Sequence, residues 1–121
     1  MAEQVEAAAP ENLDAEDAKI VTLARAARAR TGAAEGAAVR DTDGRTYAAC
    51  SVTLPSLQLT ALQAAIAAAV ASGAEGIEAA AVCTDADQVD SASVAAVRDL
   101  GKSAPVLRSN AKGEVVGVVV Q

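Results

Sequence analysis

The chain has 121 residues, 52% of them hydrophobic and only one of them aromatic, Tyr47, with a formal net charge of -6. This length predicts one domain with a thin core of Ala, Val, Leu and Ile, so we expect a homo-oligomer that buries further apolar surface. The sequence has no basic stripe and no stacking aromatics, which argues against nucleic-acid binding. It also has no long apolar run and no basic signal region, which argues against membrane insertion and favours a cytoplasmic protein.

The negative charge is concentrated at the N-terminus. Residues 1–17 contain six acidic side chains and no Lys or Arg, so the remaining ten acidic residues balance the ten basic ones. The acidic, alanine-rich residues 1–14 bury too little apolar surface to offset the cost of ordering. We therefore predict a disordered acidic tail over 1–14 and a single domain over 15–121.

A helix is predicted over residues 15–30. Apolar residues recur there at helical spacing, acidic residues open the segment and arginines close it, which suits the helix dipole. Gly32 ends the helix. Two antiparallel strands then follow at residues 36–40 and 45–53, because the turn between them contains Asp and Gly, the residues that hairpin turns favour.

An alanine-rich helix is predicted over residues 57–70. Leu54 and Pro55 interrupt the preceding strand, Ser56 is the expected N-cap, and Gly73 lies just beyond the end. The many alanines give this helix a smooth surface for close packing.

The second half of the chain alternates between strand and helix patterns. We predict a buried strand at 78–84, a helix at 90–100 that Gly101 ends, and two strands at 105–109 and 114–120 joined by a short turn. The order α-β-β-α-β-α-β-β predicts an α/β fold in which helices cover both faces of a mixed five-stranded sheet.

Several segments, in their order and spacing, resemble the small zinc-dependent cytidine deaminase family over residues 18–120. The first segment is Gly36-Ala37-Ala38-Val39 followed by Asp43-Gly44-Arg45-Thr46-Tyr47, the second is Cys50-Ser51-Val52, and the third is Asn110-Ala111-Lys112-Gly113-Glu114-Val115-Val116. These segments surround a helix that ends with Ala69-Val70-Ala71-Ser72-Gly73. The resemblance implies a three-layer α/β/α fold of the cytidine deaminase-like type.

The zinc chemistry of that family is missing. Its members begin one helix with Cys-Ala-Glu and the next with Pro-Cys-x-x-Cys; the cysteines hold zinc and the glutamate moves protons. One register places Thr60, Ala61 and Leu62 on the first motif and Val89, Asp90 and Ser93 on the second. A second register, anchored on Cys50-Ser51-Val52, puts Leu62 and Ala64 at the ligand and glutamate positions. Either register implies a degenerate member with no catalytic residue and no zinc.

The replaced residues have ordinary structural explanations. Asp90 is expected to cap the following helix, and Thr60 and Leu62 to be first-turn and core residues. At the substrate positions that the resemblance implies, a phenylalanine is replaced near Ala33 and a ribose-binding Asn-x-Glu by Ser51 and Thr53. These side chains cannot stack on a base or accept two hydroxyl hydrogen bonds as a carboxylate does.

Other residue groups give weaker signals. Cys50 and Cys83 are interpreted as small buried hydrophobes, because no histidine is present to activate a thiol. Asp85, Asp87 and Asp90 lack the glycine and glutamate of a calcium loop, and the glycines form no phosphate-binding loop.

Three functional hypotheses remain open. The first is a degenerate cytidine deaminase-like protein acting as an oligomeric scaffold or interaction protein, and so not an enzyme. The second is a cytidine- or nucleoside-deaminating hydrolase with unrecognised chemistry, for which Asp85, Asp87 and Asp90 are the only clustered carboxylates. The third is a non-catalytic module for a small, nucleoside-like ligand; the sequence identifies neither that ligand nor a protein partner.

Overall fold

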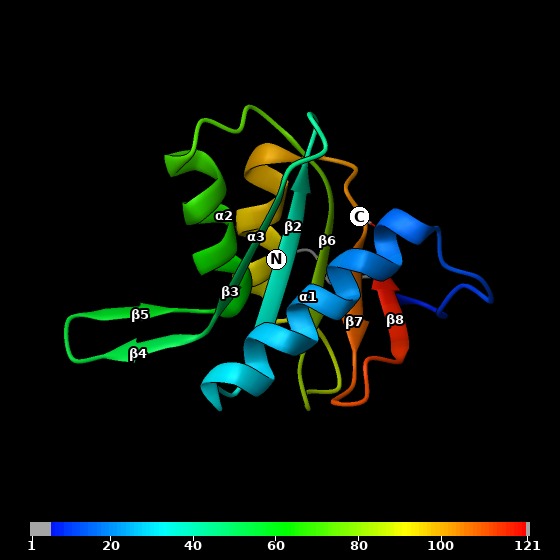
Figure 1. The fold of residues 1–121 in the computed structure, drawn as a ribbon, viewed down its shortest axis with the longest axis horizontal. Helices are drawn as coiled ribbons and strands as arrows, with labels where there is room; N and C mark the ends of the chain where they lie inside the picture. Colours follow the sequence, from blue (N-terminus) through cyan, green and yellow to red (C-terminus); the bar gives the residue numbers. More distant parts are fainter. Residues whose placement is uncertain (1–5, 121) are drawn as a thin grey trace.

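The structure is a computed structural model that describes residues 6–120. A mixed six-stranded sheet in the order β1-β8-β7-β6-β2-β3 lies between helix α1 on one face and helices α2 and α3 on the other (Figure 1). The elements are β1 (Glu6–Ala7), α1 (Ala15–Thr31), β2 (Gly36–Asp41), β3 (Thr46–Cys50), β4 (Val52–Leu54), β5 (Leu57–Leu59), α2 (Ala61–Ala71), β6 (Ile77–Cys83), α3 (Ser91–Leu100), β7 (Val106–Ser109) and β8 (Val115–Val119). The expected three-layer α/β/α fold is confirmed.

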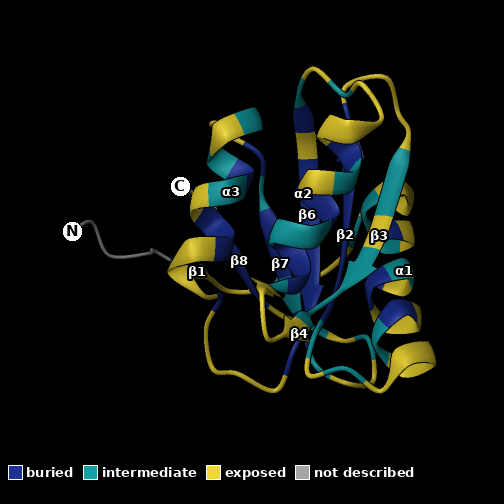
Figure 2. Ribbon diagram, turned by 90° about the vertical axis from the view of Figure 1, so that its left-hand side faces the viewer, coloured by how far each residue is buried: buried dark blue, intermediate teal, exposed yellow. Residues whose placement is uncertain are grey.

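Two apolar clusters fill the spaces on either side of the sheet. One packs α2 and α3 against β2, β6 and β7, and the other packs α1 against the opposite faces of β2 and β6. Figure 2 shows the inner strands as the most buried part of the molecule. The central strands therefore have apolar residues on both faces, as the continuous apolar run of β6 predicts.

The N-terminal segment differs from its prediction. Glu6 and Ala7 form β1 and pair antiparallel with Val119 and Val118 of β8, which adds a sixth strand to the expected five. The Glu6 carboxylate also binds the Arg108 guanidinium, with Nη2 and Oε1 2.7 Å apart. The prediction of a disordered tail is thus wrong for these two residues, because an ion pair to a distant strand holds them. Of the rest of that prediction, residues 8–14 are described and lead into α1 without forming a helix or strand, with Asp14 as the N-cap of α1, whereas residues 1–5 lie outside the described residues.

Helix α1 and the β2–β3 hairpin confirm their predictions. Asp14 caps α1 by accepting a hydrogen bond from the Glu16 amide at 2.9 Å, and Gly32 ends it with a φ of 69°. In the hairpin turn the Asp41 carboxylate accepts from the Asp43 and Arg45 amides, each at 2.9 Å. Local side-chain hydrogen bonds therefore fix the start of α1 and the hairpin turn, as their sequences indicate.

The segment before α2 is the main correction. The predicted helix over 57–70 with Ser56 as its N-cap is wrong at its start, because Leu57–Leu59 forms β5 and pairs with β4 in a separate two-stranded sheet. The alternation of Leu57, Gln58 and Leu59 favours a strand here, and the single predicted strand at 45–53 splits accordingly into β3 and β4. We call the β4–β5 hairpin the arm, and Figure 1 shows that it extends away from the body of the molecule.

Helix α2 instead begins after Thr60. The Thr60 hydroxyl accepts from the Gln63 amide at 3.1 Å, and the Gln63 side chain accepts from the Thr60 amide at 2.9 Å. This reciprocal capping box satisfies two free N–H groups, which a cap at Ser56 with a leucine three residues later could not do.

The remaining elements lie close to their predicted positions. β6 and β7 are parallel and joined through α3, whereas β7 and β8 are antiparallel neighbours. Gly101 follows the last turn of α3, as expected. Within the described part of the chain, no helix has the length and apolarity needed to cross a bilayer.

Candidate functional site

An open cleft of about 590 Å³ lies where the base of the arm meets the start of α2 and the end of β6. The last turn of α1 and the residues just before β2 form its other walls. Six of the residues that line it have uncharged polar side chains, namely Ser51, Thr53, Gln58, Thr60, Gln63 and Thr84. A cleft of this size can enclose a small molecule.

The structure brings together two of the positions that the resemblance assigns to zinc ligands. The Ser93 hydroxyl donates a hydrogen bond to the Thr60 hydroxyl at 2.7 Å, and Ser93 is only 1% exposed. The third position, Asp90, does not join them, because its carboxylate accepts from the Ala92 amide at 2.8 Å and caps α3 as expected. Two hydroxyls bonded to each other therefore occupy the space between the helix starts.

These residues do not fit zinc. Zinc in proteins is held by thiolate, imidazole and carboxylate groups, and here the two adjacent groups are aliphatic hydroxyls. Within residues 6–120, no three or more His, Cys, Asp or Glu side chains are grouped to hold a metal ion. The two hydroxyl groups instead form a contact between α2 and α3.

The position that the resemblance assigns to the proton-carrying glutamate holds an apolar side chain in both registers. In the first register it is Leu62, which is fully buried in the core against α3 and the sheet. In the second it is Ala64, and Leu62 takes a ligand position. Only the first register places two ligand positions, Thr60 and Ser93, in contact.

The three implied substrate positions are separated. Ser51 and Thr53 line the cleft, but Ala33 lies in a neighbouring depression with Arg25, Arg28 and Cys83. The Ser51 hydroxyl accepts a hydrogen bond from the Glu35 amide at 3.3 Å, so it is partly occupied by the backbone. Ala33 therefore lies outside this cleft, whereas the next residue, Ala34, lines it.

Sequence reasoning missed two of the three charged groups of the cleft, Glu35 and Arg28. Glu35 enters it from the residue before β2, and its Oε2 accepts a hydrogen bond from the Thr84 hydroxyl at 2.8 Å. Thr84 is buried, and its hydroxyl also accepts from the Ala86 amide at 3.1 Å. The available signal was that Glu35 is the only charged residue between Thr31 and Val39.

Arg28 and Asp85 form an ion pair at one wall. The guanidinium holds both carboxylate oxygens, at 2.8 Å and 3.2 Å, although the Asp85 side chain is 77% exposed. Hydrogen bonding to Arg28 and its positive charge lower the pKa of Asp85 below the ordinary value. The Asp85 carboxylate therefore binds Arg28, whereas the Asp90 carboxylate caps α3. These two carboxylates do not face a common site.

The two cysteines differ in exposure, so the expectation that both are buried hydrophobes holds for Cys83 and not for Cys50. Cys83 is fully buried, and its thiol donates to the Asn110 carbonyl oxygen with a sulfur–oxygen distance of 3.2 Å. Cys50 is half-buried, and both cysteines are free thiols. The chain has no histidine to act as their base.

Comparison with known proteins places these features in context. Residues 13–113 match the family model described as cytidine deaminase-like. The structure is similar to cytidine deaminase from Burkholderia pseudomallei, with a TM-score of 0.72 and 25% identity over 84% of this chain and 90% of that one.

Two further solved structures are similar. Cytidine deaminase from Mycobacterium leprae has a TM-score of 0.66 and 22% identity over 84% of this chain and 90% of that one. A mutant cytidine deaminase from Mycobacterium tuberculosis has a TM-score of 0.64 and 23% identity over 78% and 85%. No curated protein sequence gave a significant match.

Proposed function

This chain belongs to the cytidine deaminase-like family, and we propose that it is a catalytically degenerate member that binds no zinc and acts as an oligomeric scaffold or interaction protein. The hydrogen bond between Ser93 and Thr60 carries the first part of the proposal. It uses two former ligand positions to join α2 and α3. Leu62, buried beside them, adds apolar packing where a proton carrier is needed.

The missing groups are those that the deamination chemistry depends on. A zinc ion held by cysteines supplies an activated hydroxide, and a carboxylate carries protons to and from the base. In this chain Thr60 and Ser93 have no charge to offer a metal, and Leu62 has no proton to transfer. What remains at the helix starts is a contact that stabilises the fold.

Zinc content and cytidine turnover test this part of the proposal. The purified protein is incubated with excess zinc, dialysed and examined by elemental analysis, and the same sample is assayed for conversion of cytidine to uridine. We expect well below one zinc per chain and no turnover above background. Stoichiometric zinc, or turnover that a chelator abolishes, would contradict the proposal.

The proposed self-association rests on one edge of the molecule that carries no charge. Residues 46–74, which form the edge strand β3, the arm and α2, contain no Asp, Glu, Lys or Arg. On this surface Leu54, Leu57 and Val70 are about half exposed, at 53%, 48% and 52%. Exposed apolar side chains on an uncharged surface are typical of an interface.

A second copy of the chain is the partner that this surface fits. Two molecules that each carry a net charge of -6 repel one another, but this edge brings no like charges together. The arm is an isolated two-stranded hairpin, which is marginally stable alone and gains from packing against another subunit. These observations support a homo-oligomer formed through the arm and α2.

A second candidate function is a binding module for a small ligand. The cleft of about 590 Å³ and its polar lining favour it, although the groups for turnover are missing. No contact favours a hydrolase based on Asp85, Asp87 and Asp90, since Arg28 holds the first and α3 uses the last. A cytoplasmic location stays a prediction from the sequence.

A further inference from the structure

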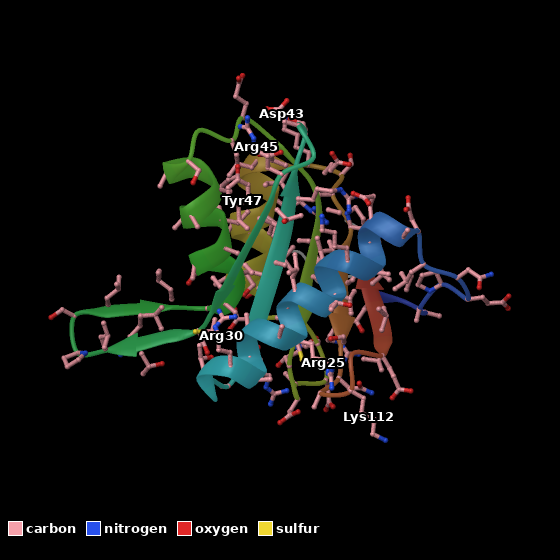
Figure 3. All side chains as sticks on the ribbon, viewed as in Figure 1. Arg25, Arg30, Asp43, Arg45, Tyr47 and Lys112 are labelled. Carbon is pink, nitrogen blue, oxygen red and sulfur yellow. The ribbon has the colours of Figure 1, made fainter. Side chains whose placement is uncertain are left out.

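Three charged side chains line the cleft, and only two of them neutralise each other. Arg28 and Asp85 form a two-pronged ion pair across one wall. Glu35 takes part in none of the ion pairs among residues 6–120. Arg30, in the same last turn of α1 (Figure 3), does not line the cleft. The cleft therefore presents one negative charge that no neighbouring cation offsets.

The Glu35 carboxylate is also held in place. The buried Thr84 hydroxyl binds Oε2 at 2.8 Å, and the backbone of Glu35 is fixed by the Ser51 amide donating to its carbonyl oxygen at 3.0 Å. A carboxylate offers about four acceptor positions, of which Thr84 uses one. The remaining positions are available to a ligand, and little side-chain freedom is lost when it binds.

The walls around this carboxylate suit a small, flat group. Apolar surface is supplied by Ala34, Val52, Leu59 and Ala86, and hydrogen-bonding groups by Thr53, Gln58 and Gln63. A planar cation with paired N–H groups binds a carboxylate through two parallel, charge-assisted hydrogen bonds. An anion would first have to displace Asp85 from Arg28.

We infer that this cleft binds a small planar cation of the amidinium or guanidinium type, with Glu35 as its anchor. The inference deepens the second candidate function and rests on it, because it names the ligand chemistry of the same cleft. It assigns Glu35 a binding role that neither the zinc positions nor the former substrate positions provide. The net charge of -6 on the chain favours the approach of a cation.

Three probes that share one ring but differ in charge test this inference. Benzamidine is a planar cation, benzamide is neutral and benzoate is an anion, and each is titrated into the full chain with thermal shift and calorimetry as readouts. We expect benzamidine alone to raise the Tm, because only a ligand that binds the folded state stabilises it. Glu35→Gln keeps an acceptor for Thr84 but removes the charge, and should weaken benzamidine binding about tenfold.

Glu75→Gln is the matched control, since Glu75 is an exposed residue between α2 and β6 that does not line the cleft. It should leave benzamidine affinity unchanged. Equal binding of benzamidine and benzamide, tighter binding of benzoate, or unchanged binding to Glu35→Gln would each overturn the inference. Zinc content and cytidine turnover are measured on the same preparation, so failure of this inference is distinguishable from failure of the proposed degeneracy.

Discussion

Ser93 in α3 and Thr60 at the start of α2 are joined by a hydrogen bond of 2.7 Å between their hydroxyl groups. Thr60 has a second task, because the same hydroxyl accepts from the Gln63 amide and caps α2. One side chain thus both begins a helix and fixes it to its neighbour. This arrangement gives a structural role to two residues at positions that the resemblance assigns to zinc ligands.

Loss of the Thr60 hydroxyl should destabilise the fold. Thr60→Val keeps the shape of the side chain but removes the N-cap acceptor and leaves the buried Ser93 hydroxyl without this partner. We expect the free energy of unfolding to fall by about 1–3 kcal/mol. Urea denaturation measures the change, and Thr60→Ser, which retains the hydroxyl, is the control. Equal stability of the two variants would argue against the double role.

Placing thiols at the positions that the resemblance assigns to zinc ligands should create a zinc site. The triple variant Thr60→Cys, Asp90→Cys and Ser93→Cys supplies three soft ligands at the starts of two adjacent helices. We expect stoichiometric zinc by elemental analysis and a higher Tm with zinc than with chelator. The variant that carries Leu62→Cys in place of Thr60→Cys tests the other register and should not bind, because Leu62 is buried in the core. The reverse result would show that the second register is correct.

Charge on the arm should disrupt self-association. Leu54→Lys with Leu57→Lys places two cations at the tip of the uncharged edge, where both native side chains are about half exposed. We expect an oligomeric wild type and a monomeric variant in light scattering coupled to gel filtration. Val116→Lys on β8, whose native side chain is 43% exposed, is the control and should keep the wild-type mass. A monomeric wild type would remove the basis of the scaffold proposal.

Stability at low pH should depend on Asp41. Burial acts to raise the pKa of Asp41, but hydrogen bonds from the Tyr47 hydroxyl and the Arg45 and Asp43 amides outweigh it and lower the pKa. Figure 3 shows these three residues together at the far end of the hairpin from the arm. A carboxyl whose pKa is lowered by folding stabilises the protein above its ordinary pKa of about 3.9, and this stabilisation is lost as the pH falls below that value.

Asp41→Asn should therefore be less stable than wild type at neutral pH, with a difference that shrinks as the solution is acidified below about pH 4. Thermal denaturation across this pH range measures it. Asp43→Asn is the control, because that side chain is exposed on the turn. A difference between Asp41→Asn and wild type that stays constant with pH would contradict the assignment.

The sequence predicted the elements whose signals are local. Helix α1 has its cap, its charge pattern and Gly32 within one segment, and the β2–β3 turn has Asp41 and Gly44. The arm was missed because its alternating leucines run directly into the alanines of α2. The Thr60–Gln63 capping box is equally local, and weighing it would have placed the start of α2 correctly.

The features that the sequence did not predict depend on distant residues. Glu6 and Arg108 are separated by 102 positions, and Glu35 and Thr84 by 49, so neither contact leaves a nearby pattern. The resemblance alone implies the ligand positions, and the contact between Thr60 and Ser93 depends on the packing of α2 against α3. The local helix signals of the sequence predict the two helices, but they do not show which side chains of α2 and α3 are in contact.

The ion pair that ties β1 to β8 also affects how many partners one copy can hold. β1 covers part of the outer side of β8, and an edge strand of two residues gives little backbone for further pairing. At the other end of the sheet β3 remains unpaired on its outer side. Among residues 6–120, β3 is therefore the one open edge of the six-stranded sheet longer than two residues, and a self-complementary contact through β3 would occupy it. Assembly through β3 would then end at a closed pair and would not grow into a filament.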